Sequence, residues 1–144
     1  MSVIKLGVVT GNRADYGLLL PLLKALRNSE KIDLKLLVTG AHLGSKFGST
    51  LTQIINDGFI VDYKIDMLLA SNSSNSIAKS VGLGVIGFSD ALTQLEPDAL
   101  LVLGDRFEIF AAAQAAYFLG IPILHIHGGE VTFGSLDDNI RHSI

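Results

Sequence analysis

Residues 99–127, ALLVLGDRFEIFAAAQAAYFLGIPILHIH, decide the fold class of this chain. Two short apolar runs, Ala99–Leu103 and Ile121–Ile126, flank an alanine-rich segment, Phe107–Phe118. The runs are nearly continuous in Val, Ile and Leu, which is typical of strands buried on both faces of a parallel sheet. The segment between them is apolar almost all round, which indicates a buried helix. The stretch therefore predicts a strand–helix–strand unit.

The same alternation runs through the rest of the chain. The other expected strands are Val3–Val9, Leu34–Thr39 and Phe59–Ile65, and the other expected helices are Tyr16–Arg27, Ser49–Asn56 and Ser76–Leu95. The run at 59–65 alternates polar and apolar residues, so we expect it nearer an edge of the sheet. This order predicts an α/β fold: a Rossmann-like parallel sheet with helices on both faces, formed by residues 1–144 as a single domain.

Two features of the expected helices carry packing information. Pro21 lies inside the first helical pattern, where it either begins the regular helix or kinks it. Gly82, Gly84 and Gly87 lie inside the long segment at 76–95. Each glycine weakens a helix by about 1 kcal/mol relative to alanine. We therefore expect this face of the helix to pack closely on the sheet.

Composition excludes several classes of protein. Hydrophobic residues make up 49% and charged residues 17%, which describes a globular domain and not a disordered tail. A net charge of −3 gives no basic face for nucleic acid. The absence of cysteine excludes disulfides and thiolate catalysis. The N-terminal apolar run is too short for a membrane span and lacks a signal-peptide cleavage site. We expect a cytoplasmic protein without a membrane partner.

Ligands of such sheets bind at the carboxyl ends of the strands. The loop after the first strand carries Arg13 at the start of a helix, a place that suits bidentate binding of a phosphate. The competing interpretation is that Asn12 or Asp15 caps the helix and Arg13 is solvated. The loop after the second strand carries His42, a candidate for the same rim, although a single histidine is more often structural.

The last two strand ends carry most of the titratable groups. Asp105 and Arg106 follow the fourth strand, and Asp105 is either a site residue or a helix N-cap. We expect His125 and His127 to point to the same face of the fifth strand. Glu130 follows, and a helix is predicted to begin after a Ser135 N-cap.

In that last helix Asp138, Arg141 and His142 share one face. Their spacing matches no strong metal motif, so we expect no metal site. Four polar loops at one edge of an apolar sheet indicate an active-site rim. The chemistry available there is acid–base catalysis by carboxylates and imidazoles, with arginines for a negative group.

The series GNRADYGLLLPLL, LLVTGAHLG, GDRFE, HIHGGEVT and DDNIRHSI resembles the hydrolysing UDP-N-acetylglucosamine 2-epimerases of the sialic-acid pathway. The resemblance covers the whole chain in the same order. It implies the N-terminal half of a GT-B-type fold, with the C-terminal UDP-binding domain absent from these 144 residues. It also implies a UDP-sugar substrate, no cofactor and a homo-oligomer.

The implied reaction is hydrolysis of UDP-N-acetylglucosamine with inversion at C-2, giving N-acetylmannosamine and UDP. A base takes the C-2 proton and UDP leaves to give a glycal. Water then adds to C-1 while a proton returns to C-2 from the other face, so carboxylates are needed on two sides of the ring. Because half the cleft is missing, the isolated piece is predicted to be inactive.

The resemblance implies roles for individual residues. Asp105 matches the family's catalytic aspartate, either Asp137 or Asp138 matches its second acid, and Arg13 is expected near the phosphates. His127 stands where some relatives have a catalytic glutamate, so the proton transfer falls either to His127 or to Glu130. The other expected substrate-binding residues are His42, Arg106, Arg141 and His142.

Two alternatives remain open. The HIHGGE form also resembles enzymes that act on bacillosamine-type UDP-2,4-diacetamido sugars in legionaminic-acid pathways. The length and the simple alternation of strands and helices are equally those of a non-catalytic, flavodoxin-like nucleotide-binding module.

Overall fold

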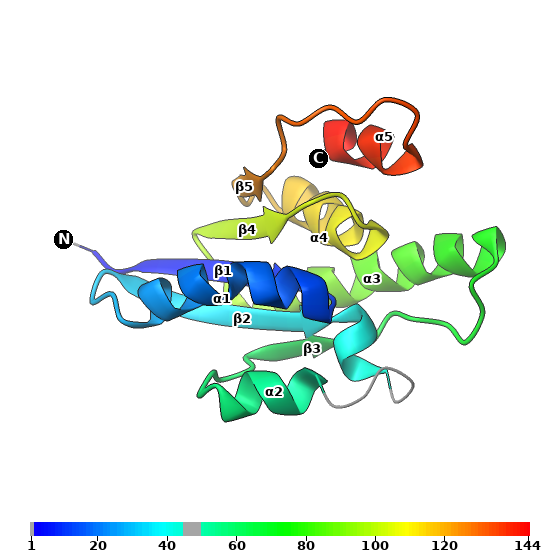
Figure 1. The fold of residues 1–144 in the computed structure, drawn as a ribbon. Coiled ribbons are helices and arrows are strands. Elements are labelled where there is room, and N and C mark those ends of the chain that lie inside the picture. Colours follow the sequence, from blue (N-terminus) through cyan, green and yellow to red (C-terminus); the bar gives the residue numbers. More distant parts are fainter. Residues whose placement is uncertain (1, 45–49) are drawn as a thin grey trace.

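The computed structural model describes residues 2–44 and 50–144. The strands are β1 (Ile4–Thr10), β2 (Ile32–Thr39), β3 (Tyr63–Ile65), β4 (Ala99–Leu103) and β5 (Ile123–Ile126). The helices are α1 (Arg13–Arg27), the 3₁₀ helix η1 (Gly40–Leu43), α2 (Thr50–Asn56), α3 (Ser74–Leu95), α4 (Phe107–Phe118) and α5 (Leu136–Ser143). Within these residues the five strands form one parallel sheet in the order β3-β2-β1-β4-β5 (Figure 1). The predicted Rossmann-like sheet is confirmed.

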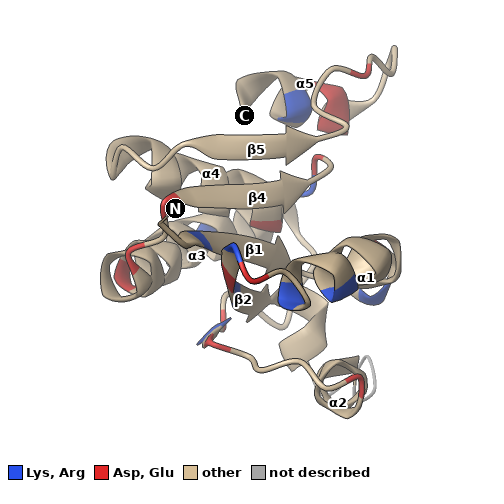
Figure 2. Ribbon diagram, turned by 90° about the vertical axis from the view of Figure 1, so that its left-hand side faces the viewer, with Lys and Arg blue, Asp and Glu red and all other residues tan. Residues whose placement is uncertain are grey.

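Helices cover both faces of the sheet, as the sequence predicted. One core contains Tyr16 and Leu19 of α1 and Ile54 of α2 against β1, β2 and β4. The other contains Phe88 of α3 and the buried alanines of α4 against the opposite face. Figure 2 shows α5 beyond β5, at the end of the sheet away from α2. None of the helices in the described segments is both long and apolar enough to cross a membrane.

The edge strand β3 is shorter than the predicted run at 59–65, although its place at the sheet edge is confirmed. The backbone of Asp62 donates to the carbonyl of Leu36 (2.9 Å), but the Asp62 carboxylate, in place of a backbone carbonyl, accepts the Leu36 N–H (2.7 Å). A side chain therefore replaces one bond of the ladder, and regular pairing begins at Tyr63.

Other boundaries also differ from the prediction: β1 is shifted by one residue from Val3–Val9, and β2 begins two residues before Leu34. β5 begins at Ile123 because the N–H of Ile121 closes the end of α4 and Pro122 has no N–H to donate. α1 begins at Arg13, so the alternative in which Pro21 begins the regular helix is wrong. α3 begins at Ser74, where the Ser73 side chain caps it. The predicted start of the second helix, Ser49, lies outside the described residues.

Two of the three glycines in α3 permit close packing, but only Gly87 packs on the sheet as predicted, whereas Gly84 packs on α4. A Cβ on Gly84 would lie 2.8 Å from the Cβ of Ala111 in α4, and a Cβ on Gly87 would lie 2.6 Å from Cγ2 of Ile65 in β3. Gly82 differs, because a Cβ there would meet no atom within 4 Å. The α3–α4 contact therefore depends on Gly84, while the prediction is wrong for Gly82.

This difference gives a matched pair of substitutions. Gly84→Ala should destabilise the protein by about 1–3 kcal/mol, because the new methyl overpacks a rigid alanine contact. Gly82→Ala, on the exposed face of the same helix, should stabilise it by about 0.5–1 kcal/mol through helix propensity. Urea denaturation of both variants measures the free energies of unfolding. Equal effects of the two substitutions would contradict the close α3–α4 packing.

Candidate active site

The loop between β1 and α1 is fixed by a reciprocal cap. The Asn12 side chain accepts from the N–H groups of Ala14 (2.8 Å) and Asp15 (3.0 Å). The Asp15 carboxylate accepts from the N–H groups of Gly11 (3.0 Å) and Asn12 (3.2 Å) and from the Asn12 amide (3.2 Å). Asn12 is thus the N-cap, and the loop holds Arg13 at the first turn of α1.

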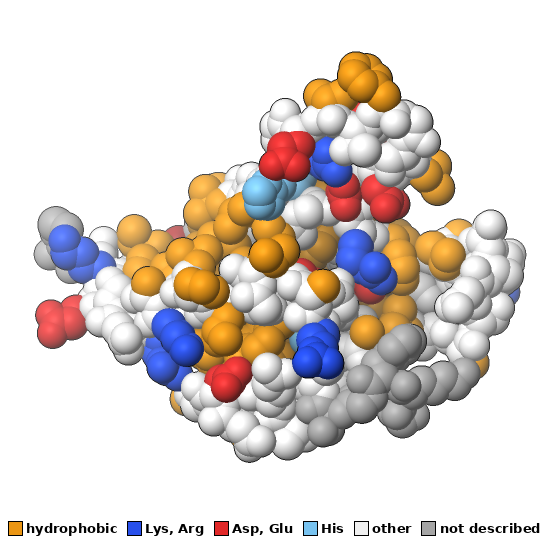
Figure 3. Space-filling model, viewed as in Figure 1, with side chains coloured by type: hydrophobic (Ala, Val, Ile, Leu, Met, Phe, Trp, Pro, Cys, Tyr) orange, Lys and Arg blue, Asp and Glu red, His pale blue; other side chains and the backbone are white. Residues whose placement is uncertain are grey.

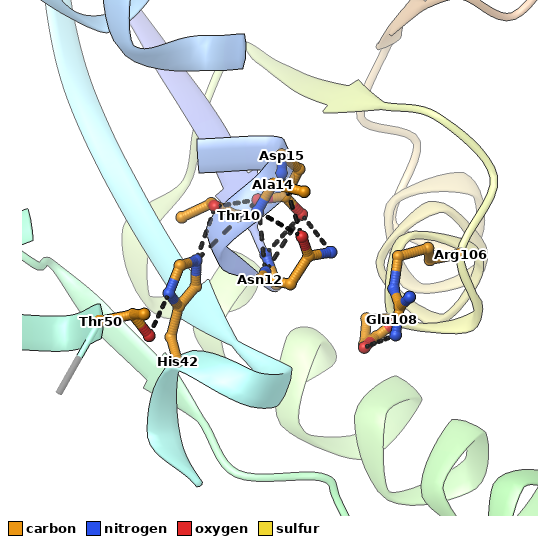
Figure 4. A network of polar contacts seen from close by, with 9 residues as sticks. Thr10, Asn12, Ala14, Asp15, His42, Thr50, Arg106 and Glu108 are labelled. Atoms are coloured by element: carbon orange, nitrogen blue, oxygen red, sulfur yellow. Dashed lines mark hydrogen bonds and ion pairs between the residues drawn. The ribbon is translucent and has the colours of Figure 1, made fainter. Parts of the chain in front are cut away.

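His42 lies behind this loop in a buried hydroxyl network (Figure 4). The Thr10 hydroxyl donates to the Asp15 carboxylate, and His42 Nε2 lies 2.9 Å from the same hydroxyl oxygen. Because the single hydroxyl proton is used on Asp15, Nε2 of His42 must donate to Thr10. His42 Nδ1 contacts the Thr50 hydroxyl at 3.0 Å. With only 2% of His42 exposed, the structure places it in the interior and not on the predicted rim.

A second buried acid, Glu108, holds Arg106. Two guanidinium nitrogens of Arg106 donate to the two carboxylate oxygens of Glu108, each at 3.2 Å. Only 1% of Glu108 is exposed, so its charge requires this pairing. Burial opposes the charge on Arg106, but the Glu108 hydrogen bonds and the carboxylates of Glu108, Asp15 and Asp137 outweigh it and raise the pKa. Arg106 is therefore a fixed cation.

The first two loops approach each other beside Glu108. The Ala41 N–H donates to the Gly11 carbonyl (2.8 Å), and a Cβ on Gly40 would lie 2.6 Å from that carbonyl. Gly40 also has a φ of 60°, in the left-handed region that favours glycine. Glycine at position 40 thus allows the carboxyl ends of β1 and β2 to share one rim.

Arg141 of α5 connects the last strand ends. One Nη donates to the Asp105 carboxylate, and the other donates to the Glu130 carbonyl (3.0 Å) and the Thr132 hydroxyl (3.2 Å). The hydrogen bond to Asp105, together with the charges of Asp105, Asp138 and Glu130, raises the pKa of Arg141 although partial burial opposes it. Asp105 is therefore an ion-pair partner and not the N-cap of α4, which is Arg106.

The acids of α5 differ in their contacts. Ser135 caps the helix by accepting from the Asp137 N–H (3.3 Å), as predicted. Asp138 accepts from the Thr132 N–H (2.8 Å) and lies 3.2 Å from His142 Nε2, so the predicted shared face is confirmed. Asp137 is exposed, and no side-chain hydrogen bond to its carboxylate is found among the described residues.

The turn after β5 separates the two histidines that the sequence placed on one face. β5 ends at Ile126, and His127 has a φ of 64°, so strand alternation does not reach it. His125 Nε2 contacts the Gly104 carbonyl (2.6 Å), whereas His127 Nδ1 pairs with the Glu130 carboxylate. The same-face prediction is therefore wrong: His125 braces β4, and His127 faces the rim.

These groups surround two adjoining hollows. Figure 3 shows charged and histidine side chains gathered where the segment carrying α5 overhangs the rest of the molecule. One hollow, of about 470 Å³, includes Arg13, Thr50, Asn72, Arg106 and Phe107 in its lining. The other, of about 320 Å³, includes Leu18, Asp105, His127, Glu130 and Arg141. Asn12, Ala14 and Arg106 line both, so candidate groups from the loops after β1, β4 and β5 meet at one rim. The buried His42 and the α5 residues Asp137, Asp138 and His142 line neither hollow.

The structure adds residues that the sequence interpretation missed. Glu108 was visible within GDRFE, but nothing local indicated its burial. Thr10 and Thr50 lie far apart in the sequence and are brought to His42 only by folding. Asp15 was predicted only as a possible helix cap, and its hydrogen bond with Thr10 was not foreseen. Within residues 2–44 and 50–144, no three His, Cys, Asp or Glu side chains lie together as a metal site requires.

A parallel sheet with this charged rim at its carboxyl ends defines a Rossmann-like domain, and its structural neighbours identify it as one of the GT-B type. The fold is similar to the structure titled UDP-GlcNAc 2-epimerase from Neisseria meningitidis bound to UDP-GlcNAc, with a TM-score of 0.82 and 24% identity over 96% of this chain and 37% of that one. The sequence profile of UDP-N-acetylglucosamine 2-epimerases matches residues 24–144. The chain belongs to this family.

Two relatives are more similar in sequence. The UDP-N,N'-diacetylbacillosamine 2-epimerase (hydrolyzing) of Legionella pneumophila is 45% identical over 97% of this chain. The GDP/UDP-N,N'-diacetylbacillosamine 2-epimerase (hydrolyzing) of Campylobacter jejuni is 40% identical over 100% of it. The chain spans 37% of the length of each relative.

The contacts of Arg141 predict how the segment 130–143 is held. Arg141→Gln should increase amide hydrogen exchange of Thr132 and α5 on the order of tenfold, the effect of losing a charge-assisted hydrogen bond. Amides of β1 and β4 should keep their protection. Lys24→Gln, on the far part of α1, is the control. Unchanged exchange in α5 would show that Arg141 does not anchor it.

Proposed function

We propose that the protein carrying this chain is a hydrolysing 2-epimerase of UDP-N,N'-diacetylbacillosamine. The observation that carries the proposal is the meeting of Asp105, Arg141, His127 and Glu130 around one hollow in a chain of the epimerase family. The reaction releases UDP and gives the free sugar inverted at C-2. It needs acid–base groups at the ring and cations at the diphosphate, and the rim holds both.

The preference for the diacetamido sugar rests on the relatives. The two relatives named for it are 45% and 40% identical to the chain, while a UDP-N-acetylglucosamine 2-epimerase of Neisseria meningitidis is 32% identical over 94% of it. UDP-N-acetylglucosamine, which the sequence analysis put first, becomes the second candidate. Both sugars carry the acetamido group at C-2, so the proposed chemistry is the same.

The arginines suit the leaving diphosphate. Arg13 and Arg106 line the same hollow, and the buried Glu108 fixes the guanidinium of Arg106 without covering it, since 53% of the Arg106 side chain is exposed. A prepositioned cation stabilises the developing charge of UDP without reorganisation. On the side of the sugar, Asp105 acts beside Arg141, and Asp137 is the α5 acid whose carboxylate accepts no side-chain hydrogen bond from residues 2–44 or 50–144.

The second wall of the cleft is proposed to come from a part of the protein outside these 144 residues. The chain spans only 37% of each of the two relatives, so those relatives contain more than this domain. The hollows fit that proposal, since neither is enclosed by this chain. We therefore expect the 144-residue chain alone to show no turnover, and the assays below use the complete protein encoded by the gene.

The substrate prediction is tested by coupled detection of UDP release. The complete protein should turn over UDP-N,N'-diacetylbacillosamine with a higher kcat/KM than UDP-N-acetylglucosamine, and in deuterated water the product should carry deuterium at C-2. A preference for UDP-N-acetylglucosamine would support the second candidate. Binding of both nucleotide sugars without UDP release would instead favour the non-catalytic module.

The role of Asp105 gives a separate prediction. Asp105→Asn should lower kcat by about 10²–10⁴-fold, the usual contribution of a general acid or base. Asp33→Asn is the control, because Asp33 lies at the amino end of β2 in an exposed pair with Lys35 (3.0 Å). Circular dichroism shows whether both variants keep the fold. Full activity of folded Asp105→Asn would contradict the assignment.

A further inference from the structure

We infer that His127 and Glu130 form one imidazole–carboxylate pair, and that His127 Nε2 is the base that takes the C-2 proton. The inference rests on the proposed 2-epimerase function and deepens it. The sequence left His127 and Glu130 as competing candidates, but the structure joins them, since His127 Nδ1 contacts Glu130 Oε1. They are therefore members of one hydrogen-bonded pair and not alternatives.

The pairing fixes which imidazole nitrogen is available. An ionised carboxylate only accepts hydrogen bonds, so His127 Nδ1 carries the proton that is shared with Glu130. In the neutral ring Nε2 then has a free lone pair. No hydrogen bond to Nε2 of His127 is found in the described part of the chain, and His127 lines the hollow with Asp105 and Arg141. The free base therefore belongs to the candidate site.

The backbone holds His127 in an unusual conformation. Its φ of 64° lies in the left-handed region, which residues other than glycine adopt uncommonly and at an energetic cost, although histidine tolerates it better than most. The next residue, Gly128, packs on the His125 ring so closely that a Cβ would lie 2.5 Å from Nδ1. His125 in turn contacts the Gly104 carbonyl, directly before Asp105. The turn that presents His127 is thus seated on the end of β4.

The other groups of this hollow are less suited to the same step. The Asp105 carboxylate is paired with Arg141, and only 20% of its side chain is exposed. Glu130 directs Oε1 at the imidazole and its carbonyl at Arg141. His127, with 55% of its side chain exposed, can present an Nε2 lone pair to a ligand. Glu130 Oε2 and Asp105 Oδ1 also have no hydrogen-bond partner among the described residues, but each belongs to a carboxylate whose other oxygen is held in an ion pair.

The proposed step balances as an elimination. Nε2 of His127 takes the proton from C-2, and the electron pair of that C–H bond forms the C-1–C-2 double bond. The C-1–O bond breaks, and its electrons leave with the diphosphate. The imidazolium formed is stabilised by the Glu130 carboxylate. In the hydration step a different group returns a proton to the opposite face of C-2, as inversion requires.

The decisive variant is His127→Gly, because glycine accepts the left-handed backbone and leaves space for a free imidazole. With the complete protein and UDP-N,N'-diacetylbacillosamine, it should lower kcat by about 10²–10⁴-fold, and added imidazole should restore part of the loss. Glu130→Gln should lower kcat with little change in KM, because its amide oxygen still accepts the Nδ1–H but carries no charge. Glu30→Gln, at the opposite end of the sheet, is the control.

A second measurement needs no activity. In ¹⁵N NMR spectra of this chain at a pH where its histidines are neutral, His127 should be protonated on Nδ1 and His125 on Nε2, because their partners are a carboxylate and a carbonyl. Glu130→Ala should abolish the preference of His127 alone. A wild-type enzyme that releases no UDP would remove the proposed function. An active wild type with an equally active His127→Gly, or with His127 protonated on Nε2, would overturn the pair and leave the function standing.

Discussion

The ion pair between Arg141 and Asp105 is the interaction on which the candidate site depends. α5 has no buried residue, and Ile144 at its end is only partly buried against the core beside α4, so polar contacts contribute much of its attachment. Polar contacts from Arg141 to Asp105, Glu130 and Thr132 connect the helix to the end of β4 and to the preceding turn. Docking of α5 and neutralisation of Asp105 are therefore one event. A change that frees either partner alters both the shape and the charge of the hollow.

Burial of the carboxylates of Asp15 and Glu108 fixes the other side of the rim. A charge removed from water needs several donors, and Asp15 receives them from Thr10, Gly11 and Asn12. Glu108 receives two from Arg106. Each acid therefore fixes its own segment: the donors to Asp15 lie in the loop after β1, and the donor to Glu108 lies two residues before it. The loops after β1 and β2 are joined by the Ala41 N–H to the Gly11 carbonyl and by His42 to Thr10. The arginines of the rim are thus carried on a rigid edge.

The sequence predicted the fold where local pattern and tertiary environment agree. β4 and α4 match their predicted bounds because continuous apolar residues are buried in both. The prediction failed where one side chain or one backbone angle changed the pattern. Asp62 replaced a ladder bond with its carboxylate, and the positive φ of His127 ended the alternation of β5. Neither effect produces a repeating pattern of polar and apolar residues, so it could not be predicted from the sequence.

For the site, the sequence predicted where the rim lies but not which of its polar residues are exposed and which are buried. Arg13, Asp105, Glu130 and Arg141 were all expected at strand ends, and the structure places them there. His42 was expected among them because it follows a strand, yet its Thr10 and Thr50 contacts bury it. Burial of a polar group depends on partners distant in sequence, which a local pattern does not contain.

The use of lone pairs separates the framework of this rim from the groups proposed to react. Asp15 and Glu108 have their oxygens occupied by internal donors, so neither can accept a proton without breaking the loop it supports. Asp138 is likewise engaged by Thr132 and His142. Asp137, at the surface, accepts no side-chain hydrogen bond within the part of the chain that the structure describes. An imidazole that donates its Nδ1–H to a carboxylate still has a lone pair on Nε2. At position 127 a histidine can therefore be anchored through Nδ1 and react through Nε2. A carboxylate at the same position would have to use one oxygen for the anchoring contact and the other for the reaction.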